Sequence, residues 1–183
     1  MSLPEVTTVC FPESGPANTD ATLALGLQRA LTLGLKDVVV ASTSGATGVR
    51  AATLFAGFNV IVVNGIFAER LDSAARETLD STGAHVVFAG HAFGMMGRAV
   101  KRRLGAVQAD EIVAQTLKIF GDGFKVAVEV TCMAVDAGLI PPGREVVAIG
   151  GYGRGADTAI VIRAAHTQDF FDTHILEVIC KPR

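Results

Sequence analysis

Apolar residues follow two alternating patterns along this chain. Short uninterrupted apolar runs at 37–42 (DVVVAS) and 59–65 (NVIVVNG) have the length and the β-branched content of strands buried on both faces of a sheet. The segment 17–34, in contrast, places Leu23 and Leu27 one helical turn apart and ends in a glycine. The pattern therefore predicts strands that alternate with amphipathic helices.

The rest of the chain continues this alternation. Asn18, Thr19 or Asp20 is expected to cap the first helix, and Gly34 is expected to end it. The further elements expected are helices at 45–57 and 71–83, a strand at 84–90, a helical block up to residue 139 with a break near Gly105, strands at 145–151 and 158–165, and an apolar segment at 175–182. Such alternation predicts a mostly parallel sheet covered by helices on both faces. Because the late strands lack long crossovers, at least one of them is expected to run antiparallel.

The length and composition of the chain indicate the number of domains and the tendency to associate. The 183 residues fit one domain, 50% of them are hydrophobic, and only 19% are charged. A mean hydropathy of +0.43 implies that much apolar surface is buried, some of it between subunits. We therefore expect a homo-oligomer.

Several classes of protein and partner are not expected. No apolar run approaches the roughly 20 residues that span a bilayer, and the N-terminus lacks the pattern of a signal peptide. Cys10, Cys132 and Cys180 are odd in number and far apart, which fits reduced thiols in a cytoplasmic protein. The net charge of −2 gives no reason to expect nucleic acid. The histidines show no paired spacing for a metal.

The loop at 42–48 (STSGATG) carries the first candidate chemistry. It follows a strand and opens a helix, so free amides, the positive end of the helix dipole and several hydroxyls would meet there. This combination suits an anion such as phosphate, held by Ser42, Thr43, Ser44, Gly45 and Thr47. An ordinary capped turn, in which Ser or Thr serves only as the N-cap, is the alternative, because such turns are common. The loop is neither a Walker loop nor a GxGxxG motif.

A second glycine-rich stretch joins two late strands. Gly151, Tyr152, Gly153, Arg154 and Gly155 form a longer connection than a tight hairpin needs. Arg154 could offer a guanidinium to a phosphate, and Tyr152 could offer a flat face or a hydroxyl. The alternative is a flexible surface connection.

At these two stretches the sequence resembles the carboxyl-terminal domain of pyruvate kinases. Residues 38–63 resemble its first strand, Ser-Thr-Ser-Gly type loop, helix and second strand, and residues 144–164 resemble its last hairpin. The resemblance covers about 18–165 and implies a three-layer α/β/α sandwich with a mixed sheet. It also implies a single domain over 1–183, with its core at about 17–165. The chain looks more like the stand-alone prokaryotic and archaeal proteins related to that domain than like a whole kinase.

The resemblance also carries expectations about function. In pyruvate kinases this domain is not catalytic, and a separate barrel, for which 183 residues leave no room, holds the active site. Pyruvate kinase activity is therefore not expected. In pyruvate kinases this domain holds a sugar-phosphate effector between the two loops. By position, the resemblance implies that residues 42–47 hold a phosphate here and that Gly153, Arg154 and Gly155 lie opposite it. Tyr152 departs from the tryptophan that effector-binding kinases tend to carry, and the loop is about one residue shorter.

Other polar and aromatic residues could line the same crevice. These are Asn18, Thr19, Asn64, His91 and Phe93, which lie near expected helix starts or strand ends, although each could equally be a cap, turn or core residue. Phe93 and Tyr152 could supply a flat apolar surface for an aromatic ring. Glu129 and Asp136 are seven residues apart, which favours a polar stripe on a helix.

Three functional hypotheses result. The first is a protein that binds flavin mononucleotide (FMN), a nucleotide or a sugar phosphate. The second is an enzyme that uses the same crevice, through a bound flavin or with His91 as acid–base group. The third is a partner-binding subunit whose loops are structural.

Overall fold

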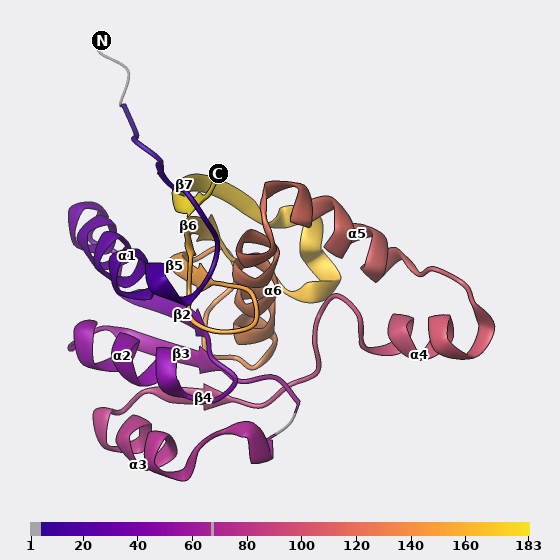
Figure 1. Cartoon of the computed structure of the whole chain (residues 1–183), viewed down its shortest axis with the longest axis horizontal. Coiled ribbons are helices and arrows are strands. Elements are labelled where there is room, and N and C mark those ends of the chain that lie inside the picture. Colours follow the sequence, from indigo (N-terminus) through magenta and orange to yellow (C-terminus); the bar gives the residue numbers. More distant parts are fainter. Residues whose placement is uncertain (1–4, 67) are drawn as a thin grey trace.

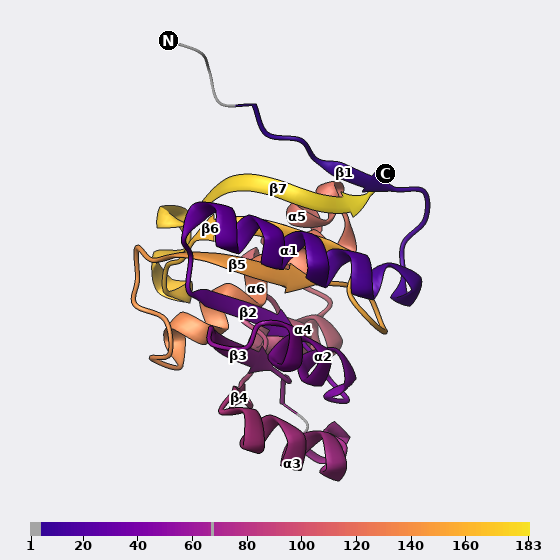
Figure 2. The same ribbon diagram turned by 90° about the vertical axis from the view of Figure 1, so that its left-hand side faces the viewer.

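The computed structural model describes residues 5–66 and 68–183, which form a seven-stranded sheet between two helical layers (Figures 1 and 2). The strand order is β1-β7-β6-β5-β2-β3-β4. The strands are β1 (Val9–Phe11), β2 (Asp37–Ala41), β3 (Asn59–Val63), β4 (His85–Val87), β5 (Glu145–Gly150), β6 (Thr158–Arg163) and β7 (His174–Pro182). Strand β6 runs antiparallel to both of its neighbours, and the other pairs are parallel. The mostly parallel mixed sheet expected from the sequence is thus confirmed.

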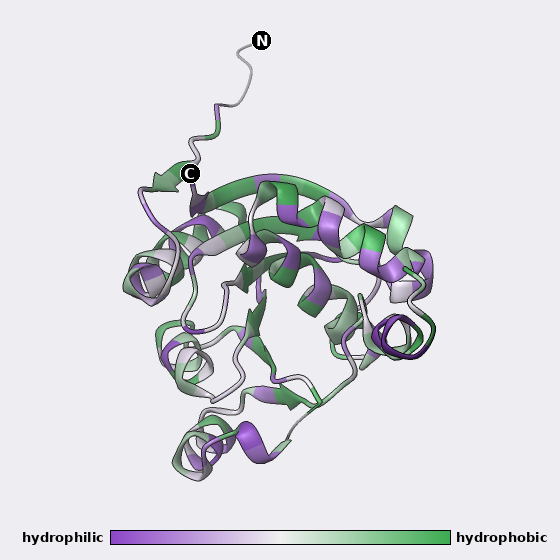
Figure 3. Cartoon of the chain, turned by 45° about the vertical axis from the view of Figure 1, so that its right-hand side comes forward, coloured by the Kyte–Doolittle hydropathy of each residue, from purple (hydrophilic) through white to green (hydrophobic). Residues whose placement is uncertain are grey.

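Side chains alternate between the two faces of the sheet and so build two cores. Val38 and Val40 face one cluster with α1 (Thr19–Leu33) and α2 (Ala46–Leu54), whereas Val39 faces the other with α6 (Asp122–Asp136). Helix α3 (Ser73–Thr82) lies on the α1 side (Figure 1). The strands are hydrophobic along most of their length (Figure 3). This is why the strand sequences read as uninterrupted apolar runs.

The remaining helices lie beside the sheet. They are α4 (Met95–Leu104), α5 (Ala109–Leu117) and the short 3₁₀ segments η1 (Pro16–Asn18), η2 (Ala68–Arg70), η3 (Lys118–Phe120) and η4 (Thr167–Asp172). Gly34, Gly83 and Gly105 end α1, α3 and α4 in the left-handed conformation, as their positions predict. Asn18 precedes α1, but its side chain does not cap the helix.

Two parts of the sheet differ from the sequence-based expectation. Strand β1 was not expected, because three residues are too few to show an alternating pattern; it forms by pairing with β7. Strand β4 covers three residues instead of seven, since it is an edge strand that pairs with β3 at three positions.

The surface bears on the expected associations. No helix in 5–66 or 68–183 is long and apolar enough to cross a membrane. Large apolar side chains are exposed at Met96, Leu104, Ile119 and Phe171. Their exposure alone does not test the expected homo-oligomer, which stays a prediction.

The connections create a switch point in the sheet. From β2 the chain adds β3 and β4 on one side, with α2 and α3 on one face. It then crosses through α6 on the other face and adds β5 on the opposite side of β2. At such a point the loops leaving β2 and β5 separate, and ligands of α/β proteins usually bind in the crevice that results.

Candidate functional site

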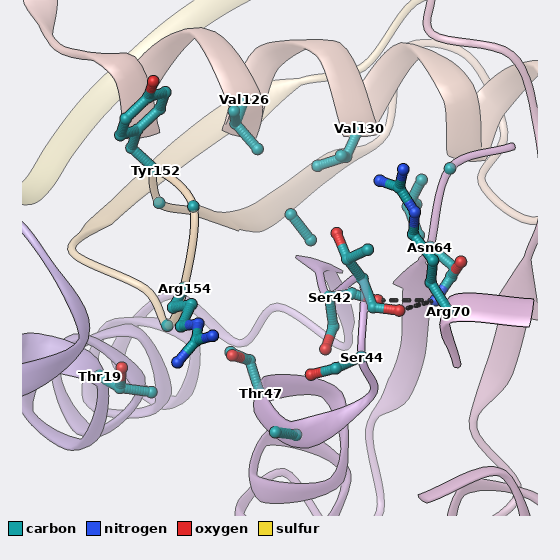
Figure 4. A pocket seen from close by; sticks show the side chains of 18 of the residues that line it. Thr19, Ser42, Ser44, Thr47, Asn64, Arg70, Val126, Val130, Tyr152 and Arg154 are labelled. Atoms are coloured by element: carbon teal, nitrogen blue, oxygen red, sulfur yellow. Dashed lines mark hydrogen bonds between the residues drawn. The ribbon is translucent and has the colours of Figure 1, made fainter. Parts of the chain in front are cut away.

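A cleft of about 870 Å³ opens at the carboxyl ends of β2, β3 and β5 (Figure 4). Its walls are the start of α2, the β5–β6 loop and one face of α6. Twelve of the residues expected from the sequence line it: Thr19, Ser42, Thr43, Ser44, Thr47, Asn64, His91, Gly151, Tyr152, Gly153, Arg154 and Gly155. The two glycine-containing loops, about a hundred residues apart in the chain, therefore face one space.

The start of α2 presents backbone donors to this cleft. Ala46 and Thr47 are the first residues of the helix, so their amides have no acceptor within it. Gly45 occupies the capping position and has no side chain to accept them. The Ser42 hydroxyl does accept the amide of Gly48, at 3.0 Å. The amide of Gly48 thus has a partner within the chain, and the amides of Ala46 and Thr47 remain for a ligand or water.

Asn64 fixes the shape of this loop from the neighbouring strand. Its side-chain amide donates to the carbonyls of Ser42, at 3.1 Å, and Thr43. The side chain is only 6% exposed. Asn64 therefore lines the cleft mainly as a support for the loop, because both protons of its amide are used there.

Gly45 and Gly155 are required for packing more than for close approach of a ligand. Gly45 has a φ of +91°, and a Cβ there would lie 2.6 Å from the Cβ of Ala75 in α3. Gly155 has a φ of +71°, and its Cβ would lie 2.4 Å from the Thr19 hydroxyl. Gly45 is accordingly not among the cleft-lining residues. At Gly45 and Gly155 the need for glycine is explained by contact with neighbouring helical segments.

The charged side chains around the cleft are mostly cationic. Arg50, Arg70 and Arg154 line it from α2, η2 and the β5–β6 loop, and Glu129 is the carboxylate in the lining. The guanidinium of Arg154 points toward Thr47 at the start of α2, and Arg70 lies across the space from it (Figure 4). This positive lining contrasts with the net charge of −2 of the whole chain and suits an anion.

Tyr152 lies at the mouth of the cleft. Its side chain is 65% exposed, and the ammonium of Lys118 lies 5.9 Å from the centre of its ring. Tyr152 also lines a smaller adjoining hollow of about 220 Å³. It can therefore contact a ligand that extends out of the main cleft.

Two expected crevice residues do not line the cleft. The Asn18 side chain turns away and donates to the carbonyl of Glu13 at 2.8 Å. Phe93 is 5% exposed and packs edge-on against Phe170, so its ring belongs to the core and to the wall of the smaller hollow. Thr19 lines the cleft, but its hydroxyl already donates to Pro16 and accepts from Ala156.

A buried charged group that the sequence interpretation missed forms part of the floor. Glu129 is 2% exposed, so the expected polar stripe with Asp136 is wrong for this residue. One Glu129 oxygen accepts from the Lys125 ammonium at 2.5 Å and lies 3.4 Å from His91 Nδ1, and the other accepts the Phe93 amide at 3.0 Å. The Lys-x-x-x-Glu spacing on an otherwise apolar helix was the signal that could have revealed the pair.

These contacts determine the ionisation of Glu129. Burial raises the pKa of its carboxyl, but the His91 hydrogen bond and the Lys125 charge outweigh burial, so the pKa lies below its ordinary value. Glu129 is thus a carboxylate whose charge is balanced by Lys125. Among the described residues, no group of three His, Cys, Asp or Glu side chains is arranged to hold a metal ion.

The comparison with known protein families agrees with this architecture. Residues 20–162 match the protein family described as pyruvate kinase, alpha/beta domain. Among solved structures, the chain is similar to a pyruvate kinase from Cryptosporidium parvum, with 10% sequence identity and a TM-score of 0.42. That match covers 84% of this chain and 24% of the kinase chain, so this chain spans about a quarter of the kinase.

Proposed function

The chain belongs to the pyruvate kinase alpha/beta domain family, and from this premise we propose that it binds a phosphorylated small molecule between residues 42–47 and 150–155. FMN, a nucleotide and a sugar phosphate are the ligand classes considered. The observation that carries the proposal is the pair of uncapped amides at Ala46 and Thr47, at the start of the helix toward which the Arg154 guanidinium points.

Backbone amides and a guanidinium complement the charge and geometry of a phosphate. The amides at a helix start lie along its dipole, whose positive end attracts anions. Arginine adds a planar pair of donors that matches two phosphate oxygens. The exposed hydroxyls of Thr43 and Ser44 can serve the remaining oxygen. A cleft of about 870 Å³ is also large enough for the organic part of a nucleotide-sized ligand.

The test is a thermal-shift comparison of matched compounds. FMN is compared with riboflavin, AMP with adenosine, and glucose 6-phosphate with glucose, so that each pair differs only by its phosphate. We expect at least one phosphorylated member to stabilise the fold by about 2.7 kcal/mol at a hundredfold excess over its Kd. For a domain of this size the melting temperature would then rise by about 5–10 °C.

Variants locate the binding. Arg154→Ala and Ser44→Ala should reduce the shift, because each removes a donor from the cleft. Arg76→Ala is the matched control, since Arg76 pairs with Asp80 on the outer face of α3. If both members of every pair shift the protein equally, or if the Arg154→Ala, Ser44→Ala double variant keeps the full shift, the proposal is wrong.

A second candidate, an enzyme acting in the same cleft, is favoured by the contact between His91 and Glu129. A histidine held by a buried carboxylate is the usual arrangement of an acid–base group. A bound flavin would colour the purified protein yellow. If the protein is colourless, and if its activity on a substrate panel is unaffected by His91→Asn, this candidate is wrong.

A further inference from the structure

His91 reaches the cleft from the segment that follows β4, and α6 holds it from below. Its Nδ1 lies 3.4 Å from the Glu129 oxygen that also accepts from Lys125. The Glu129 and Lys125 side chains are 2% and 8% exposed, whereas that of His91 is 36% exposed. One side of the imidazole ring therefore faces a buried ion pair, and part of the ring is exposed to solvent.

The charges in this group determine which nitrogen carries the proton. The negative charge of Glu129 is matched by the Lys125 ammonium, so no second cation is needed to balance it. A carboxylate oxygen only accepts hydrogen bonds, and a neutral histidine facing it must present its Nδ1–H. The other nitrogen, Nε2, then keeps its lone pair.

The Nε2 edge of the ring lies at the wall of the cleft. A Cβ placed on Gly65, which also lines the cleft, would be 3.7 Å from Nε2. Apart from Glu129, the charged residues that line this space are Arg50, Arg70 and Arg154, and all three are donors. Nε2 is thus a hydrogen-bond acceptor in a cleft whose charged lining otherwise donates.

We infer that His91 selects the organic part of the ligand: its Nε2 accepts a hydrogen bond from a hydroxyl or ring N–H group of a phosphate ester. This rests on the proposed function, because the phosphate is bound elsewhere in the same cleft. Glu129 and Lys125 are positioning residues that hold the ring and its proton. A sugar phosphate or nucleotide would gain this hydrogen bond to His91, whereas inorganic phosphate would not.

The first test needs no ligand. Long-range ¹H–¹⁵N correlation spectra of the histidine-labelled protein report the tautomer of each ring, and His91→Gln identifies the His91 signals. We expect the Nδ1–H tautomer at neutral pH. The Nε2–H tautomer would overturn the inference, and it would leave the proposed phosphate site untouched.

The second test compares two variants by isothermal titration with FMN, AMP, glucose 6-phosphate and inorganic phosphate. Asparagine places its amide near the position of Nδ1 and lacks an Nε2 equivalent, whereas glutamine carries its amide oxygen near the position of Nε2. For each phosphate ester that binds the unmodified protein, His91→Asn should weaken binding about tenfold, which is roughly 1.4 kcal/mol or one hydrogen bond. His91→Gln should keep most of the affinity, and inorganic phosphate should bind all three proteins equally.

If both variants weaken inorganic phosphate as much as the esters, or if His91→Asn has no effect, the inference is wrong. If no compound binds the unmodified protein, the proposed function fails and this role fails with it, whatever the tautomer.

Discussion

Lys125 and Glu129 form an ion pair four residues apart on α6, with both side chains nearly inaccessible to water. Glu129→Gln keeps the shape of the side chain but leaves the ammonium buried without its counter-charge. We expect the free energy of unfolding in urea to fall by about 3–5 kcal/mol at neutral pH. The Lys125→Met, Glu129→Gln double variant should regain most of this loss. The control is Asp80→Asn, which breaks the exposed pair with Arg76 at the same spacing and should cost less than about 1 kcal/mol.

Acidification probes the same pair. Because the pKa of Glu129 is lowered in the fold, its contribution to stability is complete above the ordinary value of 4.5 and is lost as the pH falls through the lower folded value. The double variant should therefore lose less stability than the unmodified protein below pH 4.5. Equal acid sensitivity of the two proteins would contradict the assignment.

At the residue scale, the sequence was most informative where the chemistry is local. Ser44 and Arg154 could be selected because each lies in a short motif beside an expected strand. The surroundings of Phe93 and Glu129 could not be predicted in the same way. A side chain of a helix or loop meets the core or a cleft according to which other elements pack against it. Periodicity gives the face of a helix, but it does not give the partner of that face.

Among the elements, α2 and α3 pack closely at Gly45, at the end of the candidate phosphate loop. Gly45→Ala would force a Cβ to 2.6 Å from Ala75 and 2.7 Å from Leu71, at a φ of +91°. Gly57→Ala imposes a similar backbone cost at +86° but meets nothing within 4 Å. We expect Gly57→Ala to cost about 1 kcal/mol and Gly45→Ala about 1–3 kcal/mol more, measured by urea unfolding. Equal losses of unfolding free energy in the two variants would show that α3 can shift away from the added Cβ at little cost.

Element order followed from the sequence more reliably than element length. The runs that became β2, β3 and β5 each begin at a polar residue, are followed by a polar residue or glycine, and are buried on both faces, so their limits are visible in the sequence. The ends of β1, β4 and β7 depend instead on which neighbour is available for pairing. The expected segment at 175–182 became β7 from His174 because β6 and β1 pair with it on either side.

For the whole molecule, pairing of the first and last strands is the long-range contact that completes the sheet. Phe11 of β1 is 8% exposed and belongs to the core beneath α1, whereas Val9 is 36% exposed. Phe11→Ala should cost about 3 kcal/mol and lower the melting temperature by about 6–12 °C. Val9→Ala should lower it by much less in the same calorimetric scan. Similar effects of the two changes would indicate that β1 contributes little beyond its backbone.

The position of β7 between β1 and β6 also constrains the order of assembly during synthesis. The ribosome makes β1 before β7, and β1 pairs with no other strand among the described residues. Until β7 emerges, strands β2 to β6 can pair with one another, whereas β1 stays unpaired. A stalled or prematurely terminated chain would thus keep the outer edge of β6 open to intermolecular pairing and aggregation.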